Sequence, residues 1–258
     1  MGRGAREMKG GESQHIVRSI FLFPFGGGSA SSYRSYAARF PPDVGQVIPV
    51  EIPGRGTRSH EEFAPCIREC AARTLDRIDT AGEGYILHGH CMGALLAFEA
   101  VKLIEAAGAP LPRFMVASGR NAPGHVNAWL RRVPRLDDRA LFEELKDLGG
   151  IPRGLSFAMA QNFLTILRND QAMLQAYDPG QTHIGVPILA LAGRDDRMTN
   201  APGLSAWQDY TSRSLSVEWL DGEHYFIFDQ ADRVARHVED FRRSVEGGCG
   251  TAESVTAT

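Results

Sequence analysis

The chain has 258 residues, of which 43% are apolar and 23% charged, and its 28 basic side chains nearly balance its 31 acidic ones. This length and composition are typical of one large globular α/β domain. The near balance of charge argues against a basic surface for nucleic acid or for an anionic membrane. The apolar runs are too short to cross a bilayer, and no apolar signal segment opens the chain. We therefore expect a soluble cytoplasmic protein.

The first half of the chain alternates short apolar runs with amphipathic segments. We expect strands at 19–23, 46–52, 85–88 and 114–118, and helices at 33–40, 61–78 and 93–107. A glycine-rich loop, 25–29, follows the first strand, where missing side chains leave backbone N–H groups able to face a ligand. Strands that alternate with helices indicate a parallel sheet covered on both faces.

The second half contains an interruption of this alternation. Between about 120 and 182 we expect helices alone, notably over 155–177, as an insertion that forms a lid. Strands at 187–192 and 216–220 and a last helix at 231–245 then resume the pattern. We predict a domain over 17–246 of the α/β class, with a mostly parallel twisted sheet, and disordered tails at 1–16 and 247–258.

The four cysteines are too sparse for a disulfide framework, and no nearby His/Cys pair completes a zinc site. Cys66 and Cys70 lie four residues apart on a predicted helix, and we interpret both as packing residues. Cys249 falls in the predicted C-terminal tail. Cys91 stands in a different context, because it occupies the middle of a motif that carries chemistry.

The motif GHCMG, residues 89–93, lies where a predicted strand passes into a predicted helix. That is the setting of a nucleophile elbow, G-x-S-x-G, with Cys91 in place of serine. Its two glycines permit a tight turn that projects the nucleophile from the backbone. The helix that follows directs its N-terminal dipole and free N–H groups at the thiol, which lowers the pKa of that thiol and favours the reactive thiolate. The alternative is that Cys91 is only a small buried packing residue.

Two partners follow in the order expected of a nucleophile, an acid and a histidine. Asp195 and Asp196 end the strand at 187–192, and His224 lies in the loop after the strand at 216–220. Both positions are at strand ends, where parallel sheets gather their ligands. We predict Cys91, His224 and Asp196 as a catalytic triad, with Asp195 the rival carboxylate; the seven other histidines lack this order and loop placement.

Two backbone groups are predicted to stabilise the oxyanion that forms during acyl transfer. They are the N–H groups of Met92, directly after the nucleophile, and of Gly26 in the glycine loop. A phosphate cradle is the alternative for this loop, but the loop lacks the G-x-x-x-x-G-K-[ST] spacing.

Seven segments resemble a known family, the type II (discrete) thioesterases of polyketide and nonribosomal peptide synthesis, within the α/β-hydrolase fold. The segments are 23–30, 52–58, 89–94, 118–123, 148–152, 193–196 and 222–226. The resemblance implies a monomer that acts on acyl groups carried as thioesters on the phosphopantetheine arm of carrier proteins. It implies carrier proteins as partners, no metal and no organic cofactor. It also places Phe25, His90, Phe163 and Tyr225 around the substrate, although the stripe that contains Phe163 has a simpler explanation as lid core.

The family usually has serine at position 91, and the cysteine found here leaves open whether the reaction is hydrolysis or acyl transfer. An acyl group that moves from a carrier thioester to a cysteine remains a thioester, so this step is nearly isoenergetic, whereas transfer to serine runs downhill. Hydrolysis is the first interpretation, and transfer of the acyl group to another thiol or amine is the alternative. A non-catalytic carrier-binding module is a third, disfavoured by the presence of both triad partners.

A basic segment in the predicted lid suggests where a carrier protein could dock. Leu130–Arg135, with Arg120 and Arg139 nearby, is a candidate surface for an acidic carrier. The alternative is a solvated face balanced by Asp137 and Asp138.

Overall fold

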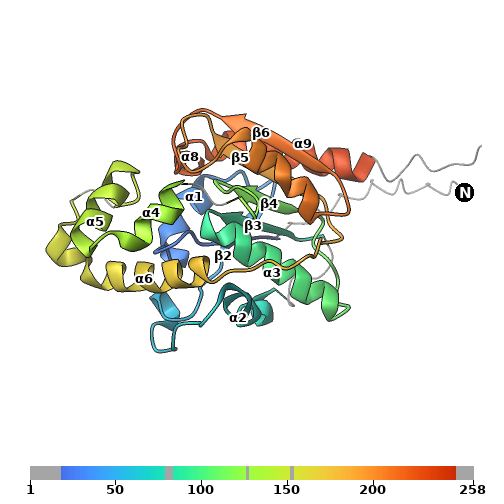
Figure 1. Ribbon diagram of the computed structural model, residues 1–258. Helices are drawn as coiled ribbons and strands as arrows, with labels where there is room; N and C mark the ends of the chain where they lie inside the picture. The colour runs from blue at the N-terminus through green and yellow to red at the C-terminus, as the bar shows by residue number, and fades with distance from the viewer. Residues whose placement is uncertain (1–18, 79–83, 126–127, 152–153, 248–258) are drawn as a thin grey trace, which may run out of the picture.

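A computed structural model describes residues 19–78, 84–125, 128–151 and 154–247 (Figure 1). The predicted N-terminal tail, Cys249 and all of the predicted C-terminal tail except Gly247 lie outside the described residues. Gly247 is the last residue of a helix.

The described strands form one sheet in which every neighbouring pair is parallel. They run in the order β2-β1-β3-β4-β5-β6. Their bounds are β1 Ser19–Phe23, β2 Gln46–Pro49, β3 Ile86–His90, β4 Met115–Ser118, β5 Ile188–Gly193 and β6 Leu215–Leu220. The chain leaves β1 for one edge and returns on the other side as β3, so the β1/β3 boundary is a topological switch point, where open parallel sheets place their ligands.

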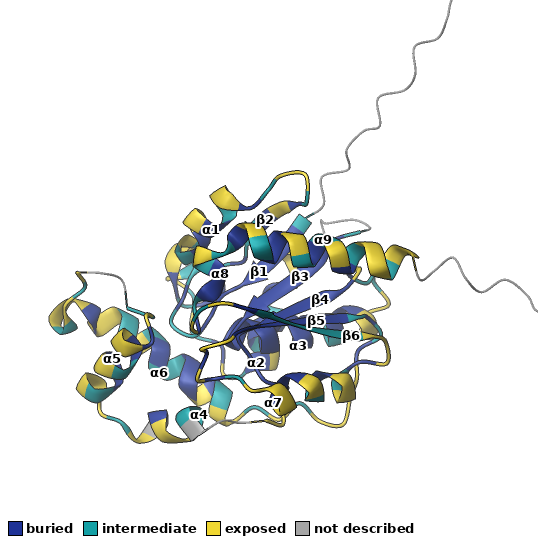
Figure 2. Ribbon diagram, turned by 90° about the horizontal axis from the view of Figure 1, so that it is seen from above, coloured by how far each residue is buried: buried dark blue, intermediate teal, exposed yellow. Residues whose placement is uncertain are grey.

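Helices cover both faces of this sheet, and the views in Figures 1 and 2 agree on their placement. α2 and α3 cover one face, while α1 and α9 cover the other. The bounds are α1 Arg34–Arg39, α2 Ile67–Ala72, α3 Met92–Ala106, α4 Ala128–Arg132, α5 Asp138–Asp147, α6 Gln161–Gln175, α7 Ala201–Ser205, α8 Phe226–Asp229 and α9 Ala231–Gly247.

Burial on both faces explains why β1 and β5 are almost continuously apolar. Successive side chains of a strand point to opposite faces. In β1, Phe21 and Phe23 therefore join the core beneath α2 and α3, whereas Ile20 and Leu22 join the core beneath α1 and α9. The expected two-sided α/β fold is confirmed.

The described part of 120–182 is helical, as expected, and it builds a small core of its own at one end of the sheet (Figure 2). Leu141 and Leu145 of α5 pack there with Leu164 and Leu167 of α6. The side chain of Asp137 caps α5 by accepting a hydrogen bond of 2.8 Å from the Ala140 N–H. We refer to these helices as the lid.

Some predicted boundaries are wrong for local reasons. The helix expected over 61–78 begins only at Ile67, because Pro65 disfavours helical backbone in the residue before it. Cys66 is the N-cap of this helix, its Sγ accepting from the Glu69 N–H. The strand expected over 46–52 ends at Pro49, and the helix expected over 155–177 is a short 3-10 turn followed by α6.

No helix in the described ranges is both long enough and apolar enough to cross a membrane.

Candidate active site

Cys91 occupies a sharp turn between β3, which ends at His90, and α3, which begins at Met92. Its backbone has φ 55° and ψ −114°, and it is the one non-glycine residue among the described positions with positive φ. The Cys91 N–H donates to the Ser118 carbonyl at 2.8 Å, which fixes the turn to β4. A strained backbone held in place by its neighbours is characteristic of a functional site.

The two glycines of the motif are required by contacts between backbones. A Cβ on Gly89 would lie 2.0 Å from the Gly93 carbonyl oxygen, and a Cβ on Gly93 would lie 2.2 Å from the Phe23 carbonyl oxygen. No real Cβ approaches an oxygen so closely, so the first turn of α3 reaches the end of β1 only because both side chains are absent. This approach brings the glycine loop beside the nucleophile.

His224 and Asp196 meet as predicted, with 3.0 Å between His224 Nδ1 and Asp196 Oδ2. Asp196 is buried and Asp195 is exposed. The Asp196 carboxylate also accepts from the Met198 N–H at 2.8 Å and the Thr199 hydroxyl at 3.2 Å. These donors orient the carboxylate toward the imidazole.

Two loops are joined so that these side chains can meet. A Cβ on Gly193 would lie 2.3 Å from the Gly222 carbonyl oxygen, which shows how closely the loops after β5 and β6 approach. The Asp195 N–H donates to that same carbonyl at 3.0 Å. Asp195, the alternative acid, thus helps to join the two loops through its backbone N–H, while its side chain is exposed to solvent.

The thiol and the imidazole change each other's acidity. Burial raises the pKa of Cys91, but the charge of His224 and a hydrogen bond from it outweigh burial, so the net pKa is lowered. Burial lowers the pKa of His224, but the Cys91 thiolate and the hydrogen bond to Asp196 outweigh it, so the net pKa is raised. Both shifts favour a thiolate–imidazolium pair.

The glycine loop leaves one of its N–H groups free. Within the described part of the chain, the Gly26 N–H has no acceptor at hydrogen-bond distance, and neither has the Met92 N–H at the start of α3. The N–H groups of the residues next to Gly26 all have acceptors. Phe25 N–H donates to Tyr33 Oη at 3.1 Å, and Gly27 N–H donates to Asp170 Oδ2 at 2.7 Å. Gly28 N–H donates to the Phe25 carbonyl at 2.9 Å. Met92 directly follows Cys91, and unoccupied N–H donors are the groups that can stabilise an oxyanion.

A buried ion pair that the sequence analysis missed holds this loop in place. Arg55 Nη1 lies 2.7 Å from Asp170 Oδ2, and Nη2 lies 2.6 Å from Oδ1. Arg55 is 2% exposed and Asp170 is fully buried. The pair also binds the loop backbone, because Asp170 accepts from the Gly27 N–H and Arg55 donates to the Gly28 carbonyl at 3.1 Å. α6 of the lid is thereby joined to the glycine loop.

Three of the four predicted substrate-pocket residues form one aromatic group. The Phe25 ring centroid lies 5.1 Å from that of Tyr225 and 6.3 Å from that of His90, and the His90 ring lies 5.2 Å from the His224 ring. His90 is fully buried and its Nδ1 lies 3.0 Å from the Ser118 hydroxyl, so it supports the elbow.

The fourth predicted pocket residue belongs to the lid. Phe163, on α6, covers the glycine loop so closely that a Cβ on Gly27 would lie 2.7 Å from its ring. A cavity of about 760 Å³ lies beside Tyr225, between the loop after β6 and the lid segment around Leu148 and Ile151.

The predicted basic patch needs a correction. Arg131, Arg135 and Arg139 are exposed on the lid, but Arg120 is only 5% exposed and lines a cavity together with Arg131 and Arg135. Arg120 is therefore a buried residue and not part of the exposed patch.

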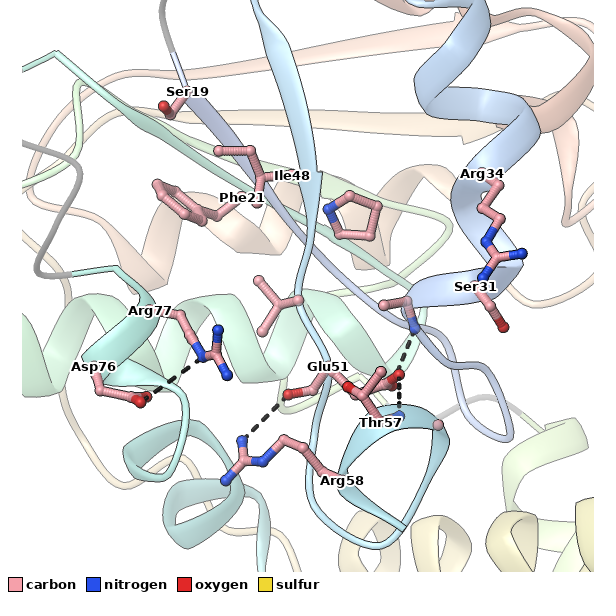
Figure 3. Close-up of a pocket in the computed structure, with 14 residues that line it drawn as sticks. Ser19, Phe21, Ser31, Arg34, Ile48, Glu51, Thr57, Arg58, Asp76 and Arg77 are labelled. Carbon is pink, nitrogen blue, oxygen red and sulfur yellow. Dashed lines mark hydrogen bonds and ion pairs between the residues drawn. The ribbon is translucent and has the colours of Figure 1, made fainter.

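A separate hollow of about 1000 Å³ lies against β1 and β2 (Figure 3). Glu51 crosses it, accepting from the Ala30 N–H at 3.1 Å and the Thr57 N–H at 3.3 Å. Its lining includes none of the predicted site residues. No cluster of three or more His, Cys, Asp or Glu in the described ranges could hold a metal ion.

Comparison with known proteins identifies the family of this chain. The family model of the thioesterase domain matches residues 18–241. The chain is 32% identical to the probable cadicidin biosynthesis thioesterase of Streptomyces griseus, over 83% of this chain and 60% of that protein. It is 29% identical to the Brevibacillus parabrevis protein named linear gramicidin dehydrogenase LgrE, over 87% of this chain and 88% of that protein.

Among solved structures, YbtT, the type II thioesterase from the yersiniabactin NRPS/PKS biosynthetic pathway, superposes with a TM-score of 0.76. It is 27% identical to this chain, and the match covers 87% of this chain and 94% of that one. With the family model spanning nearly all the strands and helices described above, the chain belongs to the thioesterase family and is a thioester hydrolase of the α/β-hydrolase fold.

Proposed function

We propose that this protein is a type II thioesterase that removes acyl groups from the phosphopantetheine arm of carrier proteins in polyketide or nonribosomal peptide synthesis. Relatives named for such pathways support the pathway class. The observation that supports the mechanism is the buried His224 imidazole, whose Nδ1 lies 3.0 Å from Asp196 Oδ2 and whose charge lowers the pKa of the Cys91 thiol.

The proposed first step is attack of the Cys91 thiolate on the thioester carbonyl. The developing oxyanion accepts hydrogen bonds from the N–H groups of Met92 and Gly26. The carbon–sulfur bond to pantetheine then breaks, and the leaving thiolate takes the proton held by the His224 imidazolium. The products of this step are the carrier's free thiol and an acyl group bound to Cys91 as a thioester.

The second step releases the acid. His224, now neutral, removes a proton from water, and the resulting hydroxide attacks the acyl carbonyl on Cys91. Collapse of that intermediate breaks the bond to Cys91 Sγ and returns the thiolate–imidazolium pair. Asp196 holds the imidazole in the tautomer that both steps require.

Acyl transfer to a second thiol or an amine is the competing function, and the cysteine itself favours it. The acyl-enzyme is as energy-rich as the carrier thioester, so the free energy of the thioester bond is retained for an acceptor. The same triad would then deprotonate an incoming thiol or amine in place of water.

Intact-protein mass spectrometry distinguishes hydrolysis from acyl transfer. The protein is mixed with an acyl-loaded carrier protein, and both proteins and the released acid are followed over time. Free acid without a lasting adduct on the enzyme supports the hydrolase. An adduct that persists in water but clears when a second carrier or an amine is added supports the transferase.

Three variants test the assigned roles in the same assay. Cys91→Ala should show no adduct and no acid, and Cys91→Ser should form an oxoester whose formation is less reversible. His224→Ala should lose turnover by a factor of about 10³ or more, as expected when a triad base is removed. Unchanged turnover in His224→Ala would refute the mechanism.

A further inference from the structure

Among the residues that the structure describes, the buried guanidinium of Arg120 has no counter-charge. Its side chain is covered, and Nη1 forms no hydrogen bond. No acid forms an ion pair with it anywhere in the described ranges. A buried charge without a counter-charge costs several kcal/mol, so proteins seldom retain one without a use.

A second buried donor faces the same empty space. Gln171, on α6, is 7% exposed, and its Nε2 has no hydrogen-bond partner. Its Oε1 is occupied by a hydrogen bond of 3.3 Å from Arg168, which leaves the amide nitrogen as the free group. Arg120 and Gln171 both line one cavity of about 560 Å³.

This cavity offers hydrogen-bond donors in an apolar setting. It lies between α4 and α6, which run side by side in Figures 1 and 2. Its walls include Leu130 and Leu174, and the exposed Arg131 and Arg135 also line it. No aspartate or glutamate belongs to this lining. An anion would find positive charge and no repulsion there.

Arg55, the other buried arginine near the site, is a useful comparison because its role is structural. Arg55 is satisfied in two places by Asp170 and in a third by the Gly28 carbonyl. Only Nε of Arg55 is left without a partner in the described part of the chain. Arg120 is similarly buried, at 5% exposed, and has none of these partners. Arg120 also lies close to the candidate triad along the chain, because a Cβ on the preceding residue, Gly119, would lie 3.3 Å from His224 Cε1. The charge of Arg120 helps to lower the pKa of the Cys91 thiol.

We propose that this cavity binds an anionic oxygen group, a carboxylate or a phosphate, carried by the thioester substrate, with Arg120 and Gln171 as the donors. The inference rests on the proposed thioesterase function, since the anion is taken to be part of the acyl thioester. Two parts of such a substrate could supply it: a carboxylate on the acyl chain or the phosphate of the pantetheine arm.

Four small thioesters distinguish these sources. They combine an acyl chain that is neutral or carboxylate-terminated, of equal length, with pantetheine that is free or 4′-phosphorylated. We expect Arg120→Gln to reduce the kcat/KM ratio of anionic to matched neutral substrate by roughly 10- to 100-fold, the effect of losing a hydrogen bond to a charged group. Using the ratio cancels any effect on Cys91 that all four substrates share.

Further variants exclude simpler explanations. Arg120→Lys keeps the charge and should retain part of the ratio, and Gln171→Met should reduce it by roughly 3- to 10-fold. Arg236→Gln removes an exposed charge from α9, far from this cavity, and should leave the ratio unchanged. If Arg120→Gln proves unstable by thermal unfolding, Gln171→Met and Arg120→Lys carry the test.

The outcomes are distinct. A loss confined to the carboxylate pair assigns the cavity to the acyl chain, and a loss confined to the phosphate pair assigns it to the pantetheine arm. Equal effects on all four substrates overturn the inference, because Arg120 then acts only through Cys91 or the fold. Failure of the wild type to hydrolyse any of the four, or full activity in Cys91→Ala, would refute the proposed function instead.

Discussion

The two halves of the candidate site are built by different means. At the ends of β3, β5 and β6, backbone approaches backbone so closely that a Cβ on Gly89, Gly93 or Gly193 would lie 2.0 to 2.3 Å from a carbonyl oxygen. The lid, by contrast, is joined to the glycine loop through side chains, above all the Arg55–Asp170 pair. The backbone half fixes the positions of Cys91 and His224, whereas the side-chain half fixes the glycine loop against the lid.

The sharpest test of the backbone half is Gly93→Ala. Its Cβ would meet the Phe23 carbonyl oxygen at 2.2 Å and the Pro24 carbonyl oxygen at 2.9 Å, and neither atom can move without breaking β1. We expect a loss of about 4 kcal/mol or more in the free energy of unfolding, measured by urea denaturation.

Gly26→Ala is the matched control for that experiment. Its Cβ would meet Leu167 Cδ1 at 3.7 Å, which is ordinary van der Waals contact, so stability should change by less than about 1 kcal/mol. Equal stability of the two variants would contradict the contrast between required and permissive glycines.

Removal of the Asp170 carboxylate tests the side-chain half. Asp170→Ala leaves the Arg55 guanidinium buried without a counter-charge and removes the acceptor of the Gly27 N–H. We expect a loss of about 3 to 5 kcal/mol in unfolding free energy, together with a lower kcat because the glycine loop loses its support.

The double variant Arg55→Met with Asp170→Ala separates charge from packing. It removes the uncompensated cation, so we expect it to be more stable than Asp170→Ala alone, while its kcat stays low. Additive losses would show that the two residues act independently, against the geometry of the pair.

The same division explains what could be predicted from the sequence. The elbow was predictable because its five residues are consecutive and their geometry is local. Asp196 and His224 were predictable because each follows a strand of a parallel sheet, whose carboxyl ends lie along one edge. The backbone half of the site is thus encoded in short segments.

The side-chain half depends on contacts that no short segment encodes. Arg55 and Asp170 are 115 positions apart, and Asp170 lies within an ordinary amphipathic helix. Arg120 was assigned to an exposed patch because it precedes the basic segment Leu130–Arg135 by only ten positions in the sequence, whereas in the structure it is buried. Sequence proximity is informative about turns and misleading about which face a long side chain occupies.

The acidity of Cys91 tests how the backbone half activates the thiol. Because the net pKa of Cys91 is lowered, its alkylation by iodoacetamide should stay fast as the pH falls below the ordinary thiol pKa of about 8.5. In His224→Ala, burial is no longer opposed by the imidazolium, so the midpoint of the profile should move above that value.

Peptide mapping by mass spectrometry makes this measurement specific to Cys91. Cys70 is an internal control, because burial raises the pKa of its thiol to about 12 and its alkylation should be slow throughout. An identical midpoint for Cys91 in the wild type and in His224→Ala would show that His224 does not set the state of the thiol.

The smallest effect should come from the ion pair on the outer face of the lid. Arg168 Nη2 lies 2.8 Å from Asp138 Oδ1, a distance close to that in the Arg55–Asp170 pair, but the two side chains are 31% and 51% exposed. We expect Asp138→Asn to change the unfolding free energy by less than about 1 kcal/mol, and the change to shrink in 1 M salt. A loss as large as that of Asp170→Ala would mean that surface contacts hold the lid. Burial would then no longer distinguish the pair that positions the glycine loop from a pair that merely joins two lid helices.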